Sequence, residues 1–436
     1  MTTISRSWAG FILTLAWPVL LLFEPHPAAA QTPGESLRVS LPLDLADSLD
    51  GAKFKIRIPA NWNGTLLIYL QGTKIGGAAS DAPLVPPVLP GPEDPLEQTL
   101  LTRGYALAGS LVSTADWQQK AEFQDTFALT SYFRGRIGEP KRVILLGTSL
   151  GGLLALRLME EYPRSYDAAI ATCAPAAGTP LRMDRTLDFA VAYATVFGWP
   201  EEKWGAIDDL KEGLNFARDV NPIVQWPKSD GSNRGAWEFI RLIAGLSSDA
   251  FWVTDPAQGY PGYFMQMLWT TQQRESIEMW STGPIVQNVD HRYALKPDEK
   301  AYLKDLGLDA DALLSTMNAR PPVYACSRCR DYAYRFATVR GILTKPVITL
   351  HTTGDGLADI TNEGYYRDAV ASWSCPDKLY QAYVGGVGHC AFTATQILTT
   401  LAAMEKWLDT GVRPDASAFP ESQGFDTRFV APKWPY

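Results

Sequence analysis

The stretch that decides the fold is residues 142–162, RVILLGTSLGGLLALRLMEEY. It begins with a continuously apolar run at 142–146, which predicts a short strand buried on both faces, as in a parallel sheet. Residues 150–162 have the pattern of a helix that ends at Pro163. The tight turn between strand and helix places Ser149 where a nucleophile elbow would hold it in strained backbone geometry.

The turn itself, GTSLG at 147–151, fits the pattern G-x-S-x-G. The pattern alone is weak, and its position between a strand and a helix is what makes it informative. The neighbours Gly147, Gly151 and Gly152 would let strand and helix approach closely, and the helix N-terminus favours negative charge developing near Ser149. The alternative is a glycine-rich turn that carries an idle serine.

Outward from this turn, apolar runs alternate with helical patterns. We expect a hairpin from 36–43 and 52–59, in which Phe54, Ile56 and Ile58 alternate with charged residues. Further strands are expected at 65–70, 104–110, 168–173, 346–350 and 379–384, and helices at 117–136 and 394–408. This alternation predicts an α/β fold with a doubly wound, mostly parallel sheet.

One region interrupts the alternation. Residues 181–340 contain no comparable buried strand, and their periodicity is mostly helical. We interpret them as an inserted, mainly helical cap domain between two parts of the core, 31–180 and 341–436. The cap holds seven of the fourteen tryptophans, which either bind an apolar or aromatic group or build the cap's own core: Trp199, Trp204, Trp226, Trp237, Trp252, Trp269 and Trp280.

The first thirty residues read as a signal peptide. Arg6 precedes an apolar run at 11–23, too short for a comfortable membrane span, and Ala28 and Ala30 form an A-x-A cleavage site. We expect cleavage after Ala30 and a secreted or periplasmic protein without stable membrane insertion. An uncleaved anchor is the alternative.

Composition limits the function classes. The 436 residues are 46% hydrophobic and 20% charged, which excludes a disordered chain and a collagen-like fibre. The formal net charge is −8 and no basic cluster stands out, so we expect no nucleic-acid partner. The composition does not predict an oligomeric state.

A nucleophilic serine needs a base and an orienting acid. His389 is the expected base, because it lies in GGVGHCAF after the last apolar strand. We expect His351, at a strand end, to be a packed residue, and His291 to be a solvated surface residue. The turn HTTGDGLADI offers two acids, of which Asp355 is preferred over Asp359 because it is closer to the strand.

The oxyanion of an acyl-transfer reaction needs preorganised N–H donors. We expect one donor at the backbone N–H of Leu150, immediately after the nucleophile. The second should come from the loop after the strand 65–70, at Gly72 or Thr73. An ordinary loop glycine is the alternative for Gly72. No residue pattern indicates a metal or another cofactor, and substrate-binding residues are not predicted.

The elbow GTSLGG, the loop YLQG, the acid turn TLHTTGDGLAD and the base turn GGVGHCAF together resemble the α/β-hydrolase superfamily. The order Ser, Asp, His is that of the family, and the cap falls where the family often inserts its lid. The resemblance implies hydrolysis through an acyl-enzyme, most often of carboxylic esters. The loop reads Gln71-Gly72 where members commonly have His-Gly. The pair His389-Cys390 resembles half of a tannase and feruloyl-esterase feature whose other half, a cysteine before the serine, is replaced by Thr148.

Five cysteines leave several pairings open. Cys326 and Cys329 form a C-x-x-C, interpreted as a structural disulfide, either local or with Cys375, rather than a metal half-site or redox pair. We expect Cys173 to be a buried small hydrophobe. The odd number leaves at least one thiol unpaired within the chain.

These observations together predict an exported serine hydrolase that cleaves carboxylic esters with an apolar or aromatic group, using Ser149, His389 and Asp355 and no cofactor. The partner would be a small-molecule ester. Three alternatives stay open: a serine peptidase or amidase with the same triad, a catalytically silent binding protein, and a thiol oxidoreductase that uses Cys326 and Cys329.

Overall fold

The computed structural model describes residues 38–73, 82–91, 95–111 and 119–435. The expected signal peptide and its cleavage site after Ala30 therefore lie outside the described residues. Within those ranges, no helix combines the length and apolarity needed to cross a bilayer.

The described chain forms one eight-stranded sheet in the order β1-β2-β4-β3-β5-β6-β7-β8. Neighbouring strands are parallel from β4 to β8, and only the β1–β2 and β2–β4 pairs are antiparallel. The predicted doubly wound, mostly parallel sheet is confirmed. Its strands are β1 (Leu43–Leu49), β2 (Ala52–Ile58), β3 (Thr65–Leu70), β4 (Ala106–Ser110), β5 (Arg142–Thr148), β6 (Ala168–Thr172), β7 (Val347–Gly354) and β8 (Leu379–Val387).

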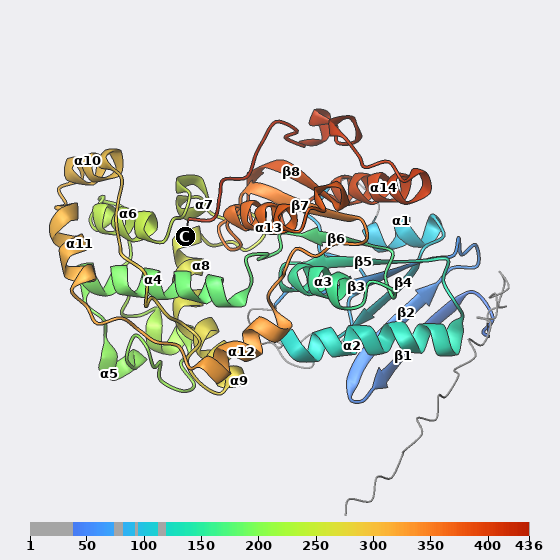
Figure 1. Ribbon diagram of the computed structural model, residues 1–436, viewed down its shortest axis with the longest axis horizontal. Coiled ribbons are helices and arrows are strands. Elements are labelled where there is room, and N and C mark those ends of the chain that lie inside the picture. The colour runs from blue at the N-terminus through green and yellow to red at the C-terminus, as the bar shows by residue number, and fades with distance from the viewer. Residues whose placement is uncertain (1–37, 74–81, 92–94, 112–118, 436) are drawn as a thin grey trace, which may run out of the picture. The chain divides into compact units, whose positions relative to one another are not determined.

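Helices cover both faces of this sheet (Figure 1). Side chains alternate along a strand, so Leu66 and Ile68 of β3 face one layer and Leu67 and Tyr69 face the other. The first pair belongs to the core cluster that contains side chains of α2 (Gln119–Tyr132), α3 (Leu150–Glu161) and α13 (Thr361–Ser372). The second pair belongs to the cluster that contains side chains of α1 (Leu96–Thr102) and α14 (Ala394–Thr410). Burial on both faces explains why the central strands are continuously apolar.

The hairpin at the sheet edge differs from the prediction. The strand expected at 36–43 is wrong, because the partner of β2 is β1, residues Leu43–Leu49. The two strands are joined at Asp50 and Gly51, whose φ angles are 48° and 90°. An Asp-Gly pair with positive φ at both positions is the preferred two-residue hairpin turn. This turn, rather than the apolar alternation upstream, sets the pairing.

The segment between β6 and β7 is helical, as expected, and Figure 1 shows most of its helices gathered beside the sheet rather than on its faces. Residues 37–436 form one compact unit, and α4 crosses position 180, so a division into separate domains at 180 and 340 stays a prediction. The helices are α4 (Thr179–Phe197), α5 (Glu201–Trp204), α6 (Arg234–Ile243), α7 (Ser248–Trp252), α8 (Gly262–Leu268), α9 (Arg274–Ser281), α10 (Pro297–Asp305), α11 (Ala310–Asn318) and α12 (Ser327–Phe336).

Several tryptophans of this segment build its own core. Trp204 and Trp237 are fully buried, and Trp226 stacks on Trp237 with the ring centroids 5.5 Å apart. Trp269, in the π-helical turn η3 (Trp269–Gln273), differs because it lines the cavity beside Ser149. Of these four tryptophans, only Trp269 is placed to meet a ligand in that cavity.

Candidate active site

Ser149 lies at the turn between β5 and α3, with φ 55° and ψ −119°. This is a strained conformation for a residue with a side chain. Glycines make the turn possible: a Cβ on Gly147 would lie 2.2 Å from the carbonyl oxygen of Gly151, and one on Gly151 would lie 2.2 Å from that of Leu70. Only glycine fits both positions, because strand and helix backbones approach so closely there.

Three side chains from distant parts of the chain meet at this turn. Nε2 of His389 lies 2.8 Å from Oγ of Ser149, and Nδ1 of His389 lies 2.8 Å from Oδ2 of Asp355. His389 is 4% exposed and Asp355 is fully buried. The structure therefore brings together the serine, base and acid that were singled out from the sequence, in hydrogen-bond geometry suited to nucleophilic catalysis.

Asp355 is held as a carboxylate. Its Oδ1 accepts hydrogen bonds from the backbone N–H groups of Leu357 and Ala358, both at 2.8 Å. Burial by itself raises the pKa of Asp355, but its contacts with His389 and His351 outweigh burial and hold the pKa well below its usual range. An ionised acid fixes the tautomer of His389 that carries a proton on Nδ1.

The other candidate groups have different partners. Asp359 accepts hydrogen bonds from the backbone N–H and hydroxyl of Thr361, at 3.0 and 2.7 Å, and so caps the start of α13. His351 is packed, as expected, and its Nε2 lies 3.3 Å from Oδ2 of Asp355. His291 is half-buried against Tyr293 rather than fully solvated, because a neighbouring ring covers it.

The predicted oxyanion donors lie around Ser149. Leu150 is the first residue of α3, and the first N–H groups of a helix have no partner within it. A Cβ on Gly72 would lie 3.0 Å from Cβ of Ser149, so the backbone of Gly72 passes directly beside the nucleophile. Gly72 and Thr73 both line the cavity that contains Ser149.

This cavity has a volume of about 740 Å³ and opens beside Ser149 and His389. Among the described residues that line it there is no Asp, Glu, Lys or Arg. Besides Ser149 and His389, the polar lining comes from Gln71, Thr73, Thr148 and Gln258. Its apolar lining includes Tyr69, Pro83, Val85, Pro86, Pro87, Val88, Leu89, Pro90, Pro256, Ala257, Trp269 and Leu357.

One contact of the site was not predicted. Asp255, in the loop before α8, accepts a hydrogen bond on Oδ2 from the backbone N–H of His389, at 2.6 Å. Its Oδ1 accepts from the N–H groups of Ala257 and Gln258. Asp255 therefore links the loop that lines the cavity to the loop that carries His389. The sequence around it, TDPAQG, shows only a common turn pattern and so gave no signal.

The disulfides correct one expectation and decide between two alternatives. Cys173, which follows β6, is bonded to Cys390, the neighbour of His389, with a Cα–Cα distance of 5.3 Å. Cys173 is therefore a bridging residue and not an isolated apolar one. Cys326 is bonded to Cys329, and Cys375 is the free thiol rather than their partner. The loops after β6 and β8 meet at one edge of the sheet, which allows the first bridge.

Within the described ranges, one group of residues has metal-like spacing, Cys173, His389 and Cys390. The two sulfur atoms are joined to each other, so they are not available as thiolate ligands.

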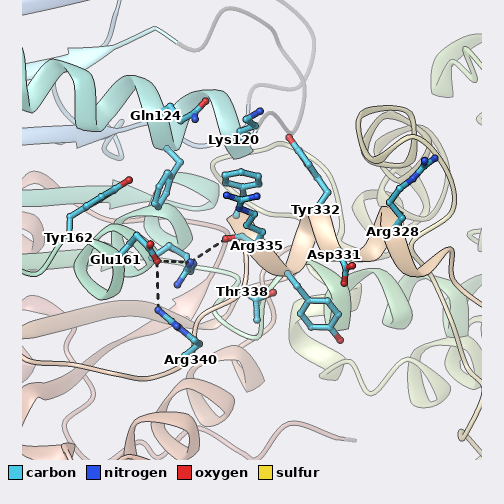
Figure 2. A pocket seen from close by; sticks show the side chains of 14 residues that line it. Lys120, Gln124, Glu161, Tyr162, Arg328, Asp331, Tyr332, Arg335, Thr338 and Arg340 are labelled. Carbon is cyan, nitrogen blue, oxygen red and sulfur yellow. Dashed lines mark hydrogen bonds and ion pairs between the residues drawn. The ribbon is translucent and has the colours of Figure 1, made fainter. Parts of the chain in front are cut away.

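A second cavity, of about 890 Å³, lies among side chains of α2, α3 and α12 (Figure 2). Glu161 pairs there with Arg157 at 3.6 Å and with Arg340 at 3.7 Å. Neither Ser149 nor His389 lines this cavity, so its larger volume does not make it the site of the chemistry.

The strand order of the sheet, the turn that carries Ser149 and the helices inserted between β6 and β7 all point to one fold. The chain has the α/β-hydrolase fold. No family model matches it. It is 24% identical, over 92% of its length and 96% of the relative's, to an o-phthalyl amidase from Xanthobacter agilis.

Two solved structures from Aspergillus oryzae resemble the chain. One is an esterase, 14% identical over 85% of this chain and 80% of that chain, with a TM-score of 0.42. The other is feruloyl esterase B, 15% identical over 85% of this chain and 82% of that chain, with a TM-score of 0.41. The fold assignment depends on the sheet and the elbow rather than on these matches.

Proposed function

We propose that the protein is a serine hydrolase that cleaves carboxylic esters with an apolar or aromatic group through an acyl-enzyme. The observation that carries this proposal is the continuous hydrogen-bonded chain from Ser149 through His389 to Asp355, at 2.8 Å for each link, beside a cavity. An idle serine would not need both a base and a buried acid aligned with it.

The steps follow from this geometry. Nε2 of His389 takes the proton of Ser149 as Oγ bonds to the acyl carbon, and the carbonyl electrons move to its oxygen. The N–H groups of Leu150 and of Gly72 or Thr73 stabilise that oxyanion. His389 then gives its proton to the leaving oxygen, which departs and leaves the acyl-enzyme. Water repeats the sequence, with His389 as base, and releases the acid.

The cavity supports an uncharged, apolar or aromatic substrate. Its described lining is dominated by prolines, aliphatic residues and Trp269, and holds no ionisable carboxylate, ammonium or guanidinium group. Such a surface gains free energy from burying an apolar group, whereas an unpaired charge would lose its hydration there.

A second candidate function is amide hydrolysis by the same residues. The observation that favours it is the 24% identity, over nearly the whole chain, to an o-phthalyl amidase. Amide cleavage uses the same nucleophile, base and oxyanion donors, but His389 must protonate a leaving nitrogen.

We also propose that the protein is exported. The signal-like residues 1–30 support this, and two disulfides suit an oxidising compartment. Intact-protein mass spectrometry of the protein that an expressing cell secretes would test this proposal. We expect the mass of a mature chain that begins at Gln31.

The central experiment compares aryl esters with anilides of the same aromatic acyl group, alongside a fluorophosphonate probe. Wild-type protein should be labelled once and should turn over the ester faster. Ser149→Ala should lose labelling and at least about 10³-fold of the activity. Faster anilide cleavage would assign the amidase function, and absence of both labelling and turnover in folded wild-type protein would contradict a serine hydrolase of either kind.

A further inference from the structure

A second histidine lies directly behind the acid of the site. His351, on β7, is fully buried. Its Nε2 lies 2.7 Å from the carbonyl oxygen of Ala358 and 3.3 Å from Oδ2 of Asp355. Its Nδ1 lies 3.0 Å from Oε1 of Glu363, which is also fully buried. The series of contacts that begins at Ser149 therefore continues beyond Asp355, through an ion-pair contact to His351 and a hydrogen bond from His351, to a second carboxylate.

The partners of this imidazole restrict where its protons lie. The carbonyl of Ala358 can only accept a hydrogen bond, so Nε2 must carry a proton. Oε2 of Glu363 already accepts from Thr349 Oγ1 and from Gln381 Nε2, both at 2.5 Å. One proton then remains to be placed between Nδ1 of His351 and Oε1 of Glu363. If it stays on Nδ1, His351 is an imidazolium.

Charge balance favours the imidazolium. Asp355 and Glu363 contact His351 directly, and three further charged groups surround these carboxylates: Arg182 interacts with Asp355 and Asp359, and Arg185 pairs with Asp359. Phenols from β8 and α13 lie near Glu363. Three carboxylates face two guanidinium groups, so one further positive charge makes the buried cluster neutral. The groups are Asp355, Asp359, Glu363, Arg182, Arg185, Tyr366 and Tyr383. Burial by itself lowers the pKa of His351, but the hydrogen bonds and charges of Asp355 and Glu363 outweigh burial and raise it to about 10.

We propose that His351 is a positioning residue of the catalytic site: as an imidazolium anchored by Glu363 and the Ala358 carbonyl, it holds Asp355 ionised and directed at His389. Two backbone N–H groups fix Oδ1 of Asp355, and the imidazolium lies 3.3 Å from Oδ2, the oxygen that also faces His389. The positive charge of His351 is next to Asp355. It therefore weakens the negative electrostatic potential that the carboxylate of Asp355 produces at His389. This inference rests on the proposed function of Ser149 and His389.

The first test measures how the reaction depends on pH. His351→Gln keeps an amide donor but removes the positive charge next to Asp355, so less positive charge opposes the positive charge that the base carries during the reaction. We expect the acidic limb of the kcat/KM profile to move up by about one pH unit or more, kcat to fall about 10-fold and KM to stay within about twofold. Glu363→Gln should move the limb in the same direction, because it removes the carboxylate that keeps the proton on Nδ1. His291→Gln, in the helical segment, is the matched control and should leave the profile unchanged.

A lower kcat with an unmoved limb would mean that His351 only fills space, and would overturn the proposal. The same profile can be recorded as the pH dependence of fluorophosphonate labelling of Ser149, which needs no substrate. Wild-type protein that is folded and unlabelled would contradict the proposed function without deciding the role of His351.

The second test needs only wild-type protein and decides the case if the variants do not fold. In protein that begins at Gln31 and is labelled with ¹⁵N-histidine, we expect one of the three histidines, at positions 291, 351 and 389, to keep both ring nitrogens protonated at pH 8. Its Nδ1 proton should show a through-space contact with Thr349 or Gln381, next to Glu363. If every histidine shows an unprotonated ring nitrogen at pH 8, His351 is neutral and the proposal is wrong.

Discussion

The two aspartates that follow β7 differ in what their carboxylates contact. Asp355 faces His389 and His351, whereas Asp359 caps α13 and lies 3.7 Å from Nη1 of Arg185. Both carboxylates are buried. Replacement of either aspartate by asparagine keeps the shape of the side chain and removes its charge. Comparing the two variants therefore separates an effect on the reaction from an effect on stability.

We expect Asp355→Asn to lower kcat by about 10⁴-fold, because an amide facing Nδ1 no longer fixes the reactive tautomer of His389. Asp359→Asn should change kcat by less than about 10-fold. It should lower the free energy of unfolding by about 3 kcal/mol, because the buried charge of Arg185 loses its partner. Steady-state kinetics and urea unfolding of both variants measure this. The choice of acid would be wrong if Asp359→Asn had the larger effect on kcat.

The loops after β6 and β8 are connected by the Cys173–Cys390 bridge, which lies next to the base. The bridge closes a stretch of 217 residues, whereas Cys326–Cys329 closes only three. Cross-linking a long stretch restricts the unfolded chain far more than cross-linking a short one. The two bridges therefore form a natural comparison of an active-site link and a local link.

The double variant Cys173→Ala with Cys390→Ala should lower the free energy of unfolding by about 2–5 kcal/mol. Its kcat should fall about 10-fold, because the loop that carries His389 loses its covalent anchor. Cys326→Ala with Cys329→Ala is the control, and both quantities should change much less. Urea unfolding and ester turnover under non-reducing conditions provide the measurements. Equal losses in the two double variants would show that the first bridge has no special connection to the site.

A feature of the structure could be predicted where the sequence pattern that determines it lies within a short stretch of the chain. The turn around Ser149 could be predicted because an apolar strand, glycines and a helix follow one another within 21 residues. His389 and Asp355 could be found because parallel strands end at one edge of the sheet.

Other contacts depend on segments that no local pattern connects. Asp255 reaches His389 across 134 residues, and Cys173 reaches Cys390 across 217. A carboxylate that binds a remote N–H has the same sequence signature as one that caps a turn. The first strand of the predicted hairpin was wrong for a different reason: the alternation at Phe54, Ile56 and Ile58 identifies one strand, but the Asp50-Gly51 turn determines which residues pair with it.

The buried charges also connect the stability of the whole chain to pH. His351 has an ordinary pKa of 6.5 that the folded structure raises to about 10. Between these values the folded chain holds a proton that the unfolded chain has lost, so we expect the contribution of His351 to the free energy of unfolding to decrease as pH rises. Burial likewise raises the pKa of Asp125, from 3.8 to about 6, but that decrease is complete near neutral pH.

Urea unfolding of wild-type and His351→Gln protein at pH 6.5, 8 and 10 isolates the contribution of this one group. The stabilisation that wild type owes to the bound proton is complete below pH 6.5 and is lost as pH rises through 10. The difference between the two proteins should therefore shrink by an amount on the order of 3 kcal/mol across this range. Other groups that titrate there, such as exposed tyrosines, act on both proteins and cancel. A difference that is constant with pH would mean that the folded chain does not hold the extra proton on His351.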